Sequence, residues 1–169
     1  MAITKQWIRA WAANYDTSYD QVIAGLGEAA PAHADVVLVV GWKSRRILSR
    51  FQQHNQPREV EAAVGVALEV IDPDEALGAL IELNWVGERV ASAVLAAFRP
   101  EVYTVMDWRA WKSLTIHGYL AGLEKATWRE SWVPYLSVCR SIAAETGVDL
   151  RTLDRALFEA KGATGLPAQ

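Results

Sequence analysis

The sequence of 169 residues predicts an all-α protein. Apolar residues recur at the three- and four-residue spacing of amphipathic helices, and the alternation typical of strands is nearly absent. Proline, glycine and capping residues divide the chain into segments of helix length. Because the sequence contains no internal repeat, low-complexity block or linker, we expect one all-α domain over residues 1–169, with about nine helices.

The first half of the chain is expected to form four helices, at 3–14, from 17 to about 25, at 33–53 and at 57–70. Thr17, with Asp20 three residues later, is a start signal for the second helix, which should fade at Gly25 and Gly27. A proline precedes the third helix, and another proline opens the fourth.

The third expected helix carries a concentration of positive charge, although the net charge of the chain is −3. The stretch from Gly41 to Arg58 has no acid and contains Lys43, Arg45, Arg46, Arg50 and Arg58. Lys43, Arg46 and Arg50 follow the spacing i, i+3, i+7, so we expect them to share one helical face as a positive stripe.

The second half opens on a strong helix start, with Asp72 as the cap and Pro73 at the first helical position. This helix should end near Leu83. The residues 84–87 are too few for anything except a tight hairpin, so a helix at 88–99 should fold back beside the first.

Three more helices should follow an extended segment at 103–106, and their expected caps are Asp107, Thr127 and Asp149. The second of them should be long and end at Gly147, and the last should end near Lys161. We expect the tail over 162–169 to be frayed. The N- and C-terminal helices should pack together as a second lobe.

Composition argues against several classes of protein. The single Cys139 can form no disulfide within the chain, and no cysteine cluster could hold zinc or an iron–sulfur centre. The longest apolar run, at 36–40, is too short for a membrane helix, and the N-terminus lacks the pattern of a secretion signal. We therefore expect a cytoplasmic protein that does not enter a membrane.

The hairpin and the acid beyond it stand in an order that resembles the helix-hairpin-helix DNA glycosylases. The hairpin spacing of that family is matched by Leu83, Val86, Gly87 and Ala91. Asp107 follows at the start of the next helix, as the family's catalytic aspartate does. The similarity is strongest over 72–114, and the segment 132–161 looks like the ending of small bacterial members. The fold implied has two helical lobes that share one unit.

The resemblance implies a protein that binds double-stranded DNA and hydrolyses the N-glycosidic bond of a damaged or modified base, without metal or organic cofactor. Asp107 would stabilise the positive charge that develops on the sugar, or activate water. Members that also cut the strand carry a lysine where this chain has Arg89. Since arginine is a poor nucleophile, the resemblance implies a glycosylase without lyase activity.

Further site residues follow from the same resemblance. Backbone amides at the start of the second hairpin helix would hold a phosphate, namely those of Gly87, Arg89 and Val90. The DNA backbone would also meet the side chains of Lys43, Arg46 and Arg50. The walls of a base pocket would be Trp108, Tyr103 and Trp42.

One departure from the family concerns the hairpin turn. This chain has Asn84-Trp85 where the family has Pro-Gly. Glycine at the second of these positions normally adopts a turn conformation that a bulky residue adopts only with strain.

Two other functions fit the same residues. Aspartate is a preferred helix cap, so capping alone would explain Asp107, and a helical hairpin can pack without binding a ligand. A chain that kept the hairpin and lost turnover would be a nucleic-acid-binding module. A chain whose tryptophans and basic stripe meet an acidic protein would be a helical protein-interaction domain.

Overall fold

A computed structural model of the protein describes residues 2–24, 26 and 31–167. All regular structure in this part of the chain is helical, which confirms the predicted fold class. The chain divides into two compact units. Unit 1 comprises the residues up to Asp16 together with those from Met106 onward, and unit 2 comprises Thr17–Val105.

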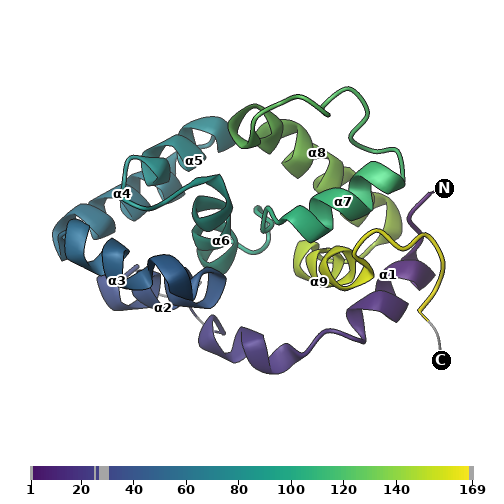
Figure 1. The fold of residues 1–169 in the computed structure, drawn as a ribbon, viewed down its shortest axis with the longest axis horizontal. Coiled ribbons are helices and arrows are strands. Elements are labelled where there is room, and N and C mark those ends of the chain that lie inside the picture. The colour runs from purple at the N-terminus through teal and green to yellow at the C-terminus, as the bar shows by residue number, and fades with distance from the viewer. Residues whose placement is uncertain (1, 25, 27–30, 168–169) are drawn as a thin grey trace. The chain divides into compact units, whose positions relative to one another are not determined.

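Unit 2 begins with a short 3₁₀-helix, η1 (Thr17–Val22), and continues with α2 (His33–Lys43), α3 (Arg45–His54), α4 (Pro57–Glu69), α5 (Pro73–Ile81) and α6 (Glu88–Phe98) (Figure 1). Helix α6 is its central element, because most of its residues are buried and it packs against α2, α4 and α5. Ala91 on α6 is fully buried, and its small side chain lets the hairpin helices approach closely.

The prediction of one continuous helix over 33–53 is wrong, because the helix is interrupted at Ser44. This residue is extended, with φ of −157° and ψ of 91°, and it separates α2 from α3. A Cβ on Gly41 would lie 3.2 Å from Cδ2 of Leu48, so the absence of a side chain at Gly41 lets Leu48 pack there. The expected helix from Thr17 is a 3₁₀-helix, and Gly25 and Gly27 lie outside the described residues.

Unit 1 consists of α1 (Lys5–Ala12), α7 (Trp108–Ile116), α8 (Trp128–Thr146) and α9 (Leu150–Ala160) (Figure 1). Helices from both ends of the sequence meet in it, since α1 and α7 each pack against α9. Its core contains fully buried side chains from all four helices, including Ile8, Leu114, Trp132 and Leu157.

The predicted caps are all made, which is why these helices begin where the sequence indicates. The carboxylate of Asp72 accepts from the amides of Asp74 and Glu75. The side chains of Thr127 and Asp149 accept from the amides at the third helical positions of α8 and α9. Gly147 ends α8 in the left-handed conformation, with φ of 63°.

The described part of the C-terminal tail, residues 162–167, is held by hydrogen bonds that the sequence does not predict. The indole Nε1 of Trp11 donates to the carbonyl of Gly165 at 2.9 Å. The amide of Gly162 donates to Oγ of Ser113 at 2.9 Å. These contacts join the tail to α1 and α7, within unit 1.

Among the helices described, none combines the length and the apolar character needed to cross a membrane. No group of three or more histidine, cysteine or acidic side chains in the described residues could hold a metal ion.

Candidate functional site

The hairpin between α5 and α6 is held from the C-terminal end of α3. The side chain of Asn55 is only 4% exposed, and its Nδ2 donates to the carbonyls of Asn84 at 2.9 Å and Phe51 at 2.8 Å. Its Oδ1 accepts from the amide of Asn84 at 2.8 Å. Nδ2 of Asn84 in turn donates to the carbonyl of His54 at 3.0 Å. These bonds fix the path of the turn.

Trp85 takes the left-handed conformation expected of a glycine at this point of the turn, with φ of 66°. A side chain in this region raises the backbone energy by about 1 kcal/mol, so the turn is kept at the expense of strain. The indole is 45% exposed. The guanidinium of Arg50 lies 4.7 Å from its centroid, and the ring of His54 meets it edge-on at 6.2 Å.

Helix α6 begins at Gly87 without a side-chain cap. The amide of Val90 already donates to the carbonyl of Gly87 at 2.9 Å, so this predicted phosphate donor is engaged within the helix. The amides of Gly87 and Glu88 make no hydrogen bond to the described residues. These two amides, rather than that of Val90, are placed to receive an anion at the helix N-terminus.

The predicted positive stripe is divided between two helices. Lys43 ends α2, whereas Arg46 and Arg50 lie on α3, so the expected common face for all three is wrong. Arg46 and Arg50 are exposed, and Lys43 is half-buried. Arg89 is exposed on the first turn of α6.

Asp107 is the N-cap of α7 in unit 1, as the sequence predicts. Its Oδ1 accepts from the amide of Arg109 at 2.9 Å, which fixes the direction of the half-buried carboxylate. Asp107 therefore has a structural role as the cap of α7. This role is compatible with chemistry, because the cap fixes the position of the carboxylate.

Two residues of α8, Tyr135 and Cys139, are fully buried, and Tyr135 lies near the charge of Asp107. Burial raises the pKa of the Tyr135 phenol well above its usual value, and the nearby charges of Cys139, Asp154 and Asp107 raise it further. Burial also raises the pKa of the Cys139 thiol, as does the carboxylate of Asp154. Both groups are therefore neutral at physiological pH, and neither is an activated nucleophile.

Three arginines and two aromatic rings gather in unit 1, and we call them the arginine–aromatic cluster: Arg109, Arg151, Arg155, Tyr15 and Phe158. The guanidinium of Arg109 lies 4.4 Å from the centroid of Phe158, and Arg151 and Arg155 lie 5.4 Å and 5.7 Å from that of Tyr15. The two rings meet edge to face at 6.0 Å. Arg109 joins this cluster to the start of α7.

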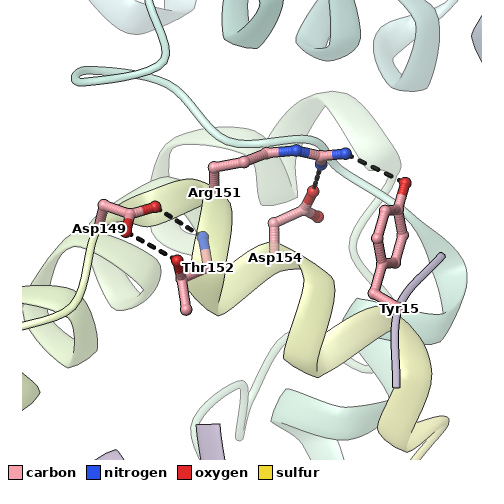
Figure 2. Close-up of polar contacts among 5 residues, drawn as sticks. All are labelled: Tyr15, Asp149, Arg151, Thr152 and Asp154. Atoms are coloured by element: carbon pink, nitrogen blue, oxygen red, sulfur yellow. Dashed lines mark hydrogen bonds and ion pairs between the residues drawn. The ribbon is translucent and has the colours of Figure 1, made fainter. Parts of the chain in front are cut away.

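Figure 2 shows the polar contacts of two members of the cluster, Arg151 on α9 and Tyr15. Arg151 forms an ion pair with Asp154, one turn along the helix, and its second nitrogen donates to the hydroxyl of Tyr15 at 3.1 Å. Asp149 caps the same helix through Thr152. Asp154 is 4% exposed, so its ion pair with Arg151 neutralises a buried carboxylate.

The sequence predicts Asp107 as the cap of α7 but does not predict the arginine–aromatic cluster. Tyr15 and Phe158 are far apart in the sequence, and only the packing of the chain ends brings them together. The one available signal was Arg109, two residues beyond Asp107 and on the first turn of the same helix.

The three predicted pocket walls do not come from one unit. Trp108 belongs to unit 1, where it is 50% exposed and lines an open hollow of about 520 Å³ with Trp111, Lys112 and Trp128. Trp42 and Tyr103 belong to unit 2. Tyr103 is only 4% exposed and Trp42 is half-buried. That these three rings share one pocket stays a prediction.

No family model matches the sequence, and no curated protein matches it. Solved structures do. The 8-oxoguanine DNA glycosylase of Thermotoga maritima superimposes with a TM-score of 0.53 and 16% identity, over 97% of this chain and 80% of that one. The 8-oxoguanine glycosylase/lyase of Methanocaldococcus jannaschii, in complex with a 15mer DNA containing 8-oxoguanine, superimposes with a TM-score of 0.54 and 15% identity. This match covers 97% of this chain and 84% of that one.

The chain has the helix-hairpin-helix DNA glycosylase fold. In this glycosylase fold, α5 and α6 are the hairpin helices, and Asp107 opens the helix that follows the extended segment. At identities of 15–16% the likeness is one of architecture. Trp85 and Arg89 are features of this chain within that architecture.

Proposed function

We propose that this protein is a DNA repair glycosylase that hydrolyses the N-glycosidic bond of a damaged or modified base. One observation carries the proposal: in a glycosylase fold, Asp107 stands at the start of α7 with its carboxylate oriented by the amide of Arg109. We also propose a cytoplasmic location, because the single Cys139 can form no disulfide within the chain and suits a reducing compartment.

The reaction needs one acid and one water molecule. As the bond between C1′ and the base nitrogen lengthens, positive charge builds on the sugar, and the carboxylate of Asp107 stabilises it. Water then forms the new bond to C1′, and its proton leaves with the base nitrogen. The products are a free base and an abasic deoxyribose.

We propose double-stranded DNA as the macromolecular ligand. Phosphates would be received by the amides of Gly87 and Glu88 at the start of α6, and by the exposed guanidinium groups of Arg46 and Arg50. In unit 1, Arg109 adds a cation next to Asp107. The DNA in the Methanocaldococcus structure supports this class of ligand.

We further propose that the enzyme releases the base without cutting the strand. Strand cleavage by a glycosylase requires an amine that attacks the sugar and forms a Schiff base. Where strand-cutting glycosylases carry this amine as a lysine, the chain has Arg89 on the first turn of α6. The guanidinium of Arg89 stays protonated and cannot form a Schiff base. In this respect the chain would differ from the Methanocaldococcus protein, which is a glycosylase/lyase.

Base release from duplexes that carry single lesions tests the proposal, with 8-oxoguanine as the first lesion because both structural relatives act on it. We expect Asp107→Asn to lower the rate by about a hundredfold or more while leaving the fold intact, since the asparagine side chain can still accept the cap hydrogen bond and only the charge is lost. Asp149→Asn is the matched control, because it makes the same change at the cap of α9 in the same unit.

Borohydride added during turnover should trap no covalent complex, since no amine occupies the position of Arg89. If the parent and Asp107→Asn release bases equally fast, Asp107 is only a cap and the proposed chemistry is wrong. Duplex binding with no base release from any lesion would instead favour the nucleic-acid-binding module. A protein-interaction domain would show no salt-dependent binding to duplex DNA.

A further inference from the structure

The exposed tryptophan of the hairpin has no part in the core or in the proposed chemistry. Trp85 is 45% exposed, and its ring contacts are made to Arg50 and His54, which are themselves exposed. The turn requires a positive φ at this position, which glycine would adopt without strain. The indole is therefore held at the surface although the backbone does not favour it.

We infer that Trp85 and Arg50 form a stacking site for the base of an unpaired nucleotide. The guanidinium of Arg50 lies over the indole at 4.7 Å from its centroid. An exposed indole backed by a guanidinium offers a flat, polarisable surface to a second planar ring. Nucleobases bind such surfaces in single-stranded nucleic acids, where their faces are not covered by neighbouring base pairs.

Charge at the site suits a nucleotide rather than a neutral aromatic ligand. Arg50 forms no ion pair with a carboxylate of the described residues, so its charge is available to a phosphate. Arg46, one turn earlier on α3, is also exposed. A base stacked on Trp85 would thus have cations close to its own phosphate.

The turn that carries Trp85 is also held in place. Asn84, immediately before Trp85, is held by hydrogen bonds of 2.8–3.0 Å to the side chain of Asn55 and the carbonyl of His54. Because the turn is fixed before binding, little conformational entropy is lost when a base stacks on the ring. The inference rests on the DNA-binding part of the proposed function but not on its chemistry.

The test compares two probes of equal length, a short oligothymidylate and an oligomer of abasic nucleotides with the same backbone. The parent should bind the oligothymidylate about 5- to 100-fold more tightly, which is the range that stacking of one base provides. Trp85→Gly removes the indole and relieves the positive φ, so it should lose this preference while its melting temperature stays level or rises. Trp85→Phe keeps a ring and should retain much of the preference.

Ile71→Ala is the control, because it removes another exposed apolar side chain from the same unit, at a position with no proposed role in binding, and should leave the ratio between the probes unchanged. Equal binding of both probes by the parent would overturn the inference. So would a Trp85→Gly variant that weakens both probes by the same factor. Base release is measured separately, so loss of the proposed chemistry with a preserved probe ratio would leave the stacking site standing.

Discussion

The fold does not require a glycine at position 87, whereas the proposed phosphate contact does. The φ of −99° and ψ of 175° at Gly87 are open to every residue, and a Cβ built on it would meet no atom within 4 Å. Nothing in the described structure therefore requires glycine there. The proposed function does, because a phosphate at the start of α6 would occupy the space that a Cβ would fill.

We predict that Gly87→Ala lowers affinity for duplex DNA by about tenfold, the loss expected for one charge-assisted hydrogen bond. Its melting temperature should remain close to that of the parent. Gly65→Ala in α4 is the control, since a Cβ there also meets nothing, and it should stabilise the helix by about 1 kcal/mol without changing affinity. Affinity for duplex DNA is measured by fluorescence anisotropy. If Gly87→Ala binds as tightly as the parent, the hairpin does not contact DNA.

Trp85 shows what residue-level reasoning could and could not predict. Its position in the hairpin spacing predicts a turn residue in the left-handed conformation, and Trp85 has that conformation, with φ of 66°. The reason that the strain is tolerated lies in Asn55, whose partner Asn84 is 29 residues away in the sequence. No local pattern indicates that contact.

At the scale of helices, the starts after Asp72, Asp107, Thr127 and Asp149 were predictable because each cap lies within three residues of the amide that it binds. The break at Ser44 was not. It accompanies a contact between Leu48 and the bare backbone of Gly41, which depends on how two helices fold against each other. Periodicity alone continues through such a break, since both segments are helical.

The cap of α9 gives a pH-dependent prediction. Burial opposes ionisation of Asp149, but hydrogen bonds from the hydroxyl and amide of Thr152 outweigh it and lower the pKa of Asp149 in the folded protein. A carboxyl with a lowered folded pKa stabilises the protein above its unfolded pKa of about 3.9 and loses that stabilisation as the pH falls through the folded value.

Asp149→Asn should therefore be less stable than the parent at pH 7, by about 0.3–1 kcal/mol for the lost charge at a helix N-terminus. The difference should shrink as the pH falls below about 3.9, because both side chains are then neutral. Urea unfolding at a series of pH values measures it. A difference that does not change with pH would show that the charge of Asp149 has no role in the cap.

At the scale of the whole molecule, the sequence predicts the two parts of the candidate site but not their surroundings. The hairpin and Asp107 are local signals, each readable within a few residues. The arginine–aromatic cluster joins Tyr15 near one end of the chain to Phe158 near the other, with Arg109 from the middle. No local sequence pattern connects these residues, because they meet only when α1, α7 and α9 pack together.

Cys139 can report how firmly that packing holds, because it is the only cysteine in the sequence and lies fully buried on α8. Burial raises the pKa of its thiol, so a thiol reagent should reach a reactive thiolate only when unit 1 opens. In native buffer we expect labelling roughly a thousandfold or more slower than in the urea-unfolded chain, with a rate that rises with urea. Asp149→Asn, which weakens the same unit by about 0.3–1 kcal/mol, should speed labelling about two- to fivefold. Labelling of the native parent at the unfolded rate would mean that the core around Tyr135 and Cys139 is open to solvent.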